Sequence, residues 1–138
     1  MKKQFVALLL LLFFTSVIHA SDSDILEKVE SSARSWLDLV DKDEYTESWR
    51  KSSAVLREKM SESDWVKSIT AIRAPLGSAG ARYIATAAQT KSWPKLPGGE
   101  YVVLQFYTTF SNKGLVMETI VLAKQQDETW PVADYSVE

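Results

Sequence analysis

The residue types of this chain that could do chemistry are carboxylates, lysine, arginine, serine, threonine and tyrosine, because the sequence holds no cysteine and one histidine. That histidine, His19, lies in an amino-terminal segment that we expect to be removed. A thiol nucleophile, a Ser-His-Asp triad and the usual zinc sites all need residues that would then be missing. Gly98-Gly99 follows a proline in a turn and does not precede a helix, so it is no phosphate loop. We expect no metal and no cofactor, and an enzyme is the less favoured class.

Glu118 is the carboxylate with the most informative position. It lies in a predicted strand, where alternation places it on the same face as Val116, Ile120 and Leu122 and therefore predicts its burial. A buried carboxylate needs a counterion, and Arg73 and Arg82 are the candidates. A structural ion pair or an edge-strand charge is favoured over catalysis. The alternative is an enzyme with Glu118 or Asp134 as general base.

Two further features are candidates for binding. Gln105 and Tyr107 share one face of a predicted strand and could line a ligand pocket, although a solvated sheet face is favoured. The indole of Trp93 lies in a loop with two prolines and two lysines. It could contact a partner or cover the end of the core, and the sequence does not decide between these roles.

Four acidic residues lie close together in the sequence and could supply oxygen ligands for calcium: Asp38, Asp41, Asp43 and Glu44. Their spacing does not match the twelve-residue calcium loop. Solvent contacts and helix caps are the favoured roles.

The elements that would position these residues come in two blocks. Helical periodicity predicts helices over about 22–40, 44–60 and 61–75, and a period of two then predicts strands over 82–90, 101–110, 115–124 and 130–137. Helices followed by a meander predict an α+β fold in which three amino-terminal helices pack on a four-stranded, curved antiparallel sheet.

The first twenty residues are typical of a secretory signal peptide. Lys2 and Lys3 precede an apolar run from Phe5 to Phe14, and cleavage is expected near Ala20. The leader holds two of the 16 basic residues and none of the 18 acidic ones, so residues 21–138 carry a formal charge of −4. We expect a single domain over 21–138, periplasmic or secreted, with no stable membrane anchor after cleavage and no nucleic-acid partner.

Several short motifs in the expected domain carry a family resemblance. They include Trp36-Leu37-Asp38-Leu39-Val40-Asp41, Arg73-Ala74-Pro75-Leu76-Gly77, Gly99-Glu100-Tyr101 and Glu118-Thr119. In order and spacing the chain resembles the exported bacterial domain-of-unknown-function 4019 family, with Lys42 where the turn favours glycine. The resemblance implies no activity. Its order of elements is similar to the cone-shaped nuclear-transport-factor-two-like fold, in which a curved sheet wraps around a long helix.

These observations favour a non-catalytic module of the bacterial cell envelope that binds an unidentified small ligand or an envelope protein. Trp93, Gln105, Tyr107, Glu118, Arg73 and Arg82 are the candidate binding residues. The alternatives are the small enzyme described above, with its pocket between helices and sheet, and a structural scaffold that forms a homodimer through the outer sheet face.

Overall fold

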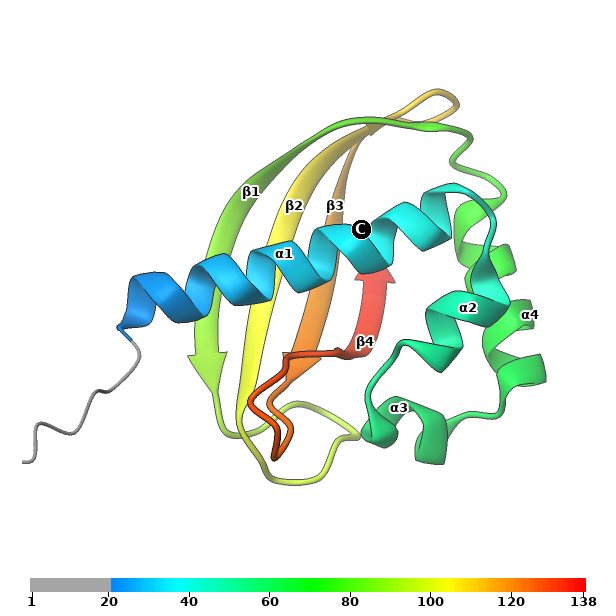
Figure 1. The fold of residues 1–138 in the computed structure, drawn as a ribbon. Coiled ribbons are helices and arrows are strands. Elements are labelled where there is room, and N and C mark those ends of the chain that lie inside the picture. The colour runs from blue at the N-terminus through cyan, green and yellow to red at the C-terminus, as the bar shows by residue number, and fades with distance from the viewer. Residues whose placement is uncertain (1–20) are drawn as a thin grey trace, which may run out of the picture.

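Helix α1 (Asp22–Asp41) crosses the concave face of a curved, four-stranded antiparallel sheet (Figure 1). The computed structural model describes residues 21–138, so the expected leader over 1–20 lies outside the described residues. Helices α2 (Tyr45–Arg50), α3 (Ala54–Lys59) and α4 (Glu62–Arg73) gather at one end of the sheet, beside its last strand. The predicted α+β class, with helices before strands, is confirmed.

The sequence of α1 accounts for its start and for its buried side. Ser21 caps the helix by accepting a hydrogen bond from the backbone N–H of Asp24 at 3.3 Å, and two aspartates in the first turn suit the helix dipole. One stripe of the helix is buried against the sheet: Val29, Ala33, Trp36, Leu37 and Val40. No helix within 21–138 combines the length and apolarity that crossing a membrane requires.

The single helix predicted over 44–60 is wrong, because the chain breaks between α2 and α3. Ser53 is extended and its side chain caps α3 by accepting from the N–H of Leu56 at 3.3 Å. Its own N–H donates to the carbonyl of Val132 at 2.8 Å. Ser52 accepts from the indole of Trp36 at 3.1 Å. These tertiary hydrogen bonds replace helical ones, and helical periodicity does not reveal them.

The turn from α4 into the sheet depends on a glycine. Ser61 caps α4 by accepting from the N–H of Asp64 at 3.2 Å, as its sequence predicts. Gly77 then adopts a φ of +79°, and a Cβ there would lie 2.2 Å from the hydroxyl of Ser111. Glycine is therefore required where the chain enters the sheet.

The sheet is a meander in the order β1-β2-β3-β4. Its strands are β1 (Ala79–Thr90), β2 (Tyr101–Phe110), β3 (Gly114–Ala123) and β4 (Val132–Val137). Strand β2 has the predicted bounds, whereas β1 begins three residues earlier than predicted and β4 two residues later. Register shifts interrupt the β1–β2 ladder after Ala79 and after Ile84, and such irregularities bend a strand.

The concave side of the sheet meets α1 and forms the main core. Strands β2 and β3 contribute Val102, Leu104, Phe106, Ile120 and Leu122, all nearly inaccessible. A second, smaller cluster lies on the opposite side of the sheet, where Tyr101, Val121 and Ala133 are buried. The outer face is therefore solvated along only part of its length.

Candidate functional site

Glu118 lies at the centre of a buried polar cluster between the sheet and the helices. Its side chain is fully buried on the concave face of β3, as alternation predicts. Arg82 Nε donates to its Oε1 at 2.7 Å, and the Thr108 hydroxyl donates to the same oxygen at 2.5 Å. The Tyr135 hydroxyl donates to Oε2 at 2.5 Å. Both carboxylate oxygens are therefore occupied by groups of the chain.

The other end of the Arg82 guanidinium binds a second carboxylate, that of Asp41 at the end of α1. Its Nη1 lies 2.8 Å from Oδ2 of Asp41, and Nη2 lies 3.1 Å from Oδ1. Asp41 also accepts from Nη2 of Arg73 at 2.7 Å. Burial by itself would raise the pKa of Asp41, but the hydrogen bonds from Arg82 and Arg73 outweigh it and hold that pKa below its ordinary value.

Arg73 does not neutralise Glu118 directly, in contrast to Arg82. It extends from the last turn of α4 to Asp41, and its guanidinium stacks over Phe110 at 4.9 Å from the ring centre. Nε and Nη1 of Arg73 are buried and make no hydrogen bond within the described residues. Four charged side chains are therefore linked in place of one ion pair. Glu118 binds Arg82, Arg82 binds Asp41, and Asp41 binds Arg73.

This cluster joins the sheet to the helices and encloses the Glu118 carboxylate. The negative charges of the two carboxylates equal the positive charges of the two guanidinium groups. Glu118 has no exposed surface through which a substrate could reach it. Burial, followed by the nearby Glu118 charge, raises the pKa of the Tyr135 phenol, so this group remains a neutral donor. The geometry supports the structural interpretation of Glu118.

Trp93 lies over the smaller cluster on the outer face of the sheet. It is half-buried against Tyr101, Val121 and Ala133, and its indole N–H donates to Oδ2 of Asp134 at 3.1 Å. The loop thus covers one end of the outer face. Asp134, the other carboxylate considered as a base, is held by this hydrogen bond.

Gln105 and Tyr107 lie on the same outer face, further along β2. The Gln105 amide oxygen accepts from Thr86 at 2.6 Å, and its nitrogen lies 3.4 Å from the hydroxyl of Thr119. Tyr107 is 44% exposed and lies opposite Tyr83, which is 68% exposed. These side chains are therefore not brought together with Glu118, Arg73 and Arg82, which occupy the concave side.

Two of the four acidic residues at the end of α1 and before α2 already have partners within the chain. Asp41 is occupied by the two arginines, and Asp43 accepts from the Tyr45 hydroxyl at 2.9 Å. Within residues 21–138, no three acidic, histidine or cysteine side chains converge as metal ligands would.

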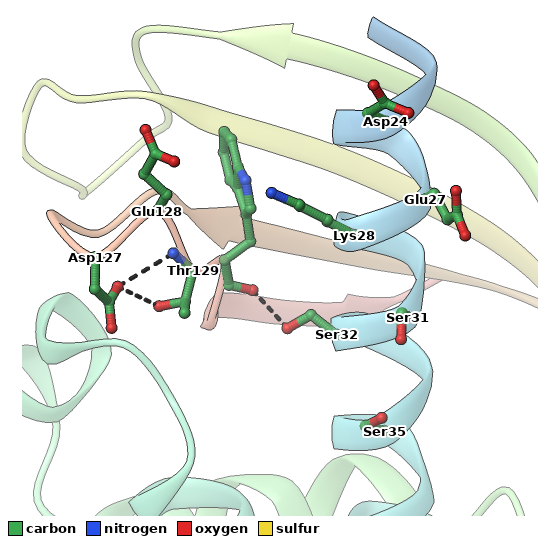
Figure 2. A pocket seen from close by; sticks show the side chains of 10 residues that line it. Asp24, Glu27, Lys28, Ser31, Ser32, Ser35, Asp127, Glu128 and Thr129 are labelled. Carbon is green, nitrogen blue, oxygen red and sulfur yellow. Dashed lines mark hydrogen bonds between the residues drawn. The ribbon is translucent and has the colours of Figure 1, made fainter. Parts of the chain in front are cut away.

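A groove that sequence patterns did not reveal runs between α1 and the β3–β4 turn (Figure 2). One hollow of about 850 Å³ adjoins a second of about 700 Å³, and the two share five lining residues. Those shared residues are Ser32, Ser35, Asp127, Thr129 and Trp130. We call the two hollows together the α1 groove.

The two ends of the α1 groove carry opposite charges. Asp24, Glu27 and Glu128 line its first hollow, together with Lys28 (Figure 2). The second hollow has Arg50, Lys51 and Arg57 instead. Asp127, in the shared middle, accepts from the backbone and hydroxyl of Thr129 at 3.1 and 2.6 Å, so its charge is partly satisfied.

Trp130, in the middle of the groove, differs from the other tryptophans in its hydrogen bonding. Indole N–H groups elsewhere donate to acceptors of the chain: Trp36 to Ser48 and Ser52, Trp49 to Met60, Trp65 to Ser48 and Trp93 to Asp134. The indole N–H of Trp130 makes no hydrogen bond within residues 21–138, and this nitrogen remains accessible to solvent although most of the residue is buried. Its carbonyl accepts from Ser32 at 2.6 Å, which ties the turn to α1.

Comparison with known proteins shows to which family the chain belongs. The DUF4019 family, described as a protein of unknown function, matches residues 32–135. The chain belongs to this family. The DUF4019 match begins within α1 and ends in β4, so it takes in the buried charge cluster as well as most of the α1 groove.

A solved structure shares the fold of this DUF4019 chain. It is a 2.5 Å structure from Catenulispora acidiphila, with 14% identity and a TM-score of 0.51, covering 87% of this chain and 94% of that one. At this identity the likeness concerns the fold alone. No curated protein matches the chain.

Proposed function

We propose that this DUF4019 protein is an exported, non-catalytic binding module of the bacterial cell envelope and that the α1 groove is its ligand site. The observation that carries this proposal is the indole N–H of Trp130. Unlike the other four indole N–H groups, which all donate to acceptors of the chain, it stays accessible to solvent at the wall of the groove. A ligand oxygen in the groove would satisfy it.

The charges of the groove favour an elongated ligand with a positive and a negative end. A cationic end would lie by Asp24 and Glu128, and an anionic end by Lys51 and Arg57. No carboxylate within the described residues forms an ion pair with Lys51 or Arg57. These two cations therefore remain available to an anion.

The length of the groove favours a short peptide with free ends. At a rise of about 1.5 Å per residue, α1 covers about 22 Å between Asp24 and Leu39. An extended chain covers about 3.4 Å per residue, so six or seven residues would reach from the acidic to the basic end. A peptide carbonyl near the middle would accept from Trp130.

The test uses a random library of hexapeptides and heptapeptides, with the protein labelled with ¹⁵N at its tryptophan side chains. The indole signals are recorded by NMR, and W130F assigns the signal of Trp130. We expect the free library to shift this signal more than that of Trp93 on the opposite face. A double reversal, K51E with R57E, should abolish the shift, whereas the remote pair K67E with K113E should preserve it.

Blocking the peptide ends tests the charge argument separately. The same library with acetylated amino ends and amidated carboxyl ends should not shift the indole NMR signal of Trp130. A signal that stays unchanged with the free library would overturn the proposed site. Equal shifts with both libraries would overturn the zwitterionic ligand.

A further inference from the structure

Strand β1 has an unusually open edge. It pairs with β2 on one side and lies at the border of the sheet on the other (Figure 1). It is 12 residues long, whereas β4 at the opposite border has six. The border of β4 is also partly occupied, because its Val132 carbonyl accepts from the N–H of Ser53 at 2.8 Å. The free backbone groups of the sheet are therefore concentrated on β1.

Large apolar side chains gather at this same edge. All residues of β1 from Tyr83 to Gln89 are exposed, and Tyr83 and Ile84 are 68% and 38% accessible. Leu26 of α1, 37% accessible, lines an apolar groove of about 390 Å³ with Ala87 and Ala88. An extended chain added alongside β1 would cover this groove and pair with the strand.

Beyond the register shift after Ile84, the edge lacks the features that protect edge strands from pairing. Residues 83–90 contain neither a charge nor a proline. The nearest charge on β1, Arg82, faces the buried cluster, and its carbonyl accepts from Arg34 at 3.3 Å. The regular, unprotected stretch of the edge therefore begins at Thr86.

We propose that a second copy of this chain occupies the edge, by antiparallel pairing of the two β1 strands across a two-fold axis. An uncharged strand can pair with itself without bringing like charges together. A two-fold axis at Ala87 pairs Ile84 with Thr90 of the second copy and Thr86 with Ala88. Only small side chains then meet at the centre, and the two sheets become one of eight strands.

To test this pairing, the full-length chain is expressed and the mass of the purified protein is measured by sedimentation equilibrium. We expect the mass to approach twice that of the monomer as the concentration rises. A88K places a charge at the centre of the edge and should raise the dissociation constant at least about tenfold. S136K is the matched control on the opposite edge, where an exposed serine is replaced, and should have no effect.

Because the chain has no cysteine, single cysteine variants give a second measurement. In an antiparallel pair, opposite residues have Cα atoms about 4.5–5.5 Å apart, which suits a disulfide. A87C, which lies on the proposed axis opposite its own copy, should form a disulfide-linked dimer under mild oxidation, whereas A88C and S136C should not. A protein that stays monomeric at high concentration, or a dimer that A88K leaves intact, would overturn edge pairing. The second outcome would favour the outer sheet face instead.

Discussion

Nε of Arg82 lies 2.7 Å from Oε1 of the fully buried Glu118. The rest of the same guanidinium binds Asp41 through two hydrogen bonds, so one side chain joins β1, β3 and the end of α1. Removing one member of a buried ion pair leaves the other uncompensated and is usually costly. The stability of the protein should therefore depend on this cluster more than on any surface ion pair.

Glu118→Gln should lower the free energy of unfolding by about 3 kcal/mol. The amide has one acceptor oxygen where the carboxylate has two, so Arg82 or Tyr135 loses its acceptor. Urea denaturation followed by circular dichroism measures the change. Glu100→Gln is the control, because Glu100 pairs with Lys124 at an exposed position, and it should cost less than about 1 kcal/mol. Equal effects of the two changes would contradict the central role of Glu118.

The two arginines of the cluster should not be equivalent. Arg82→Met leaves Glu118 without a cation and should cost about 3–5 kcal/mol. Arg73→Met leaves Asp41 with both hydrogen bonds from Arg82 and removes two nitrogens that have no partner within 21–138. Its cost should be about 1–2 kcal/mol. Chemical denaturation of both variants gives the ranking, and an inverted order would refute this division of roles.

Asp41 should contribute to acid unfolding. Its folded pKa lies below the ordinary value of 3.8, so its contribution is present above that value and is lost as the pH falls through the folded pKa. The free energy of unfolding should therefore decrease as the pH is lowered from about 5 to about 2.5. Asp41→Asn removes the titrating group, and its stability should decrease less over the same range. Parallel curves for the two proteins would show that other carboxylates govern acid unfolding.

Gly77→Ala should destabilise the entry into the sheet by about 1–3 kcal/mol. The new Cβ would collide with the hydroxyl of Ser111, which itself accepts from the N–H of Ser78 at 2.8 Å. A positive φ adds backbone strain. Gly98→Ala is the matched control, because nothing lies within 4 Å of its added Cβ. Thermal unfolding should show a lower midpoint for Gly77→Ala and little change for Gly98→Ala.

Local patterns were enough to predict the class of fold, the bounds of β2 and the burial of Glu118. Alternation determines which face of a strand a residue occupies, and three apolar neighbours on that face indicate the core. The need to neutralise a buried charge made Arg73 and Arg82 the candidate counterions, and Arg82 is the one that binds Glu118. The same argument did not reveal that Arg73 binds Asp41, because several arrangements neutralise four charges equally well.

Periodicity and residue type in the sequence alone determined that amphipathic helices precede a meander and that one carboxylate is buried among apolar side chains. The tertiary structure decided the break at Ser53, the position of Asp41 between two arginines and the α1 groove. Each of these depends on groups far apart in the chain, such as Ser53 with Val132 and Ser32 with Trp130. Local propensity does not contain such contacts, because they form only when separate elements pack together.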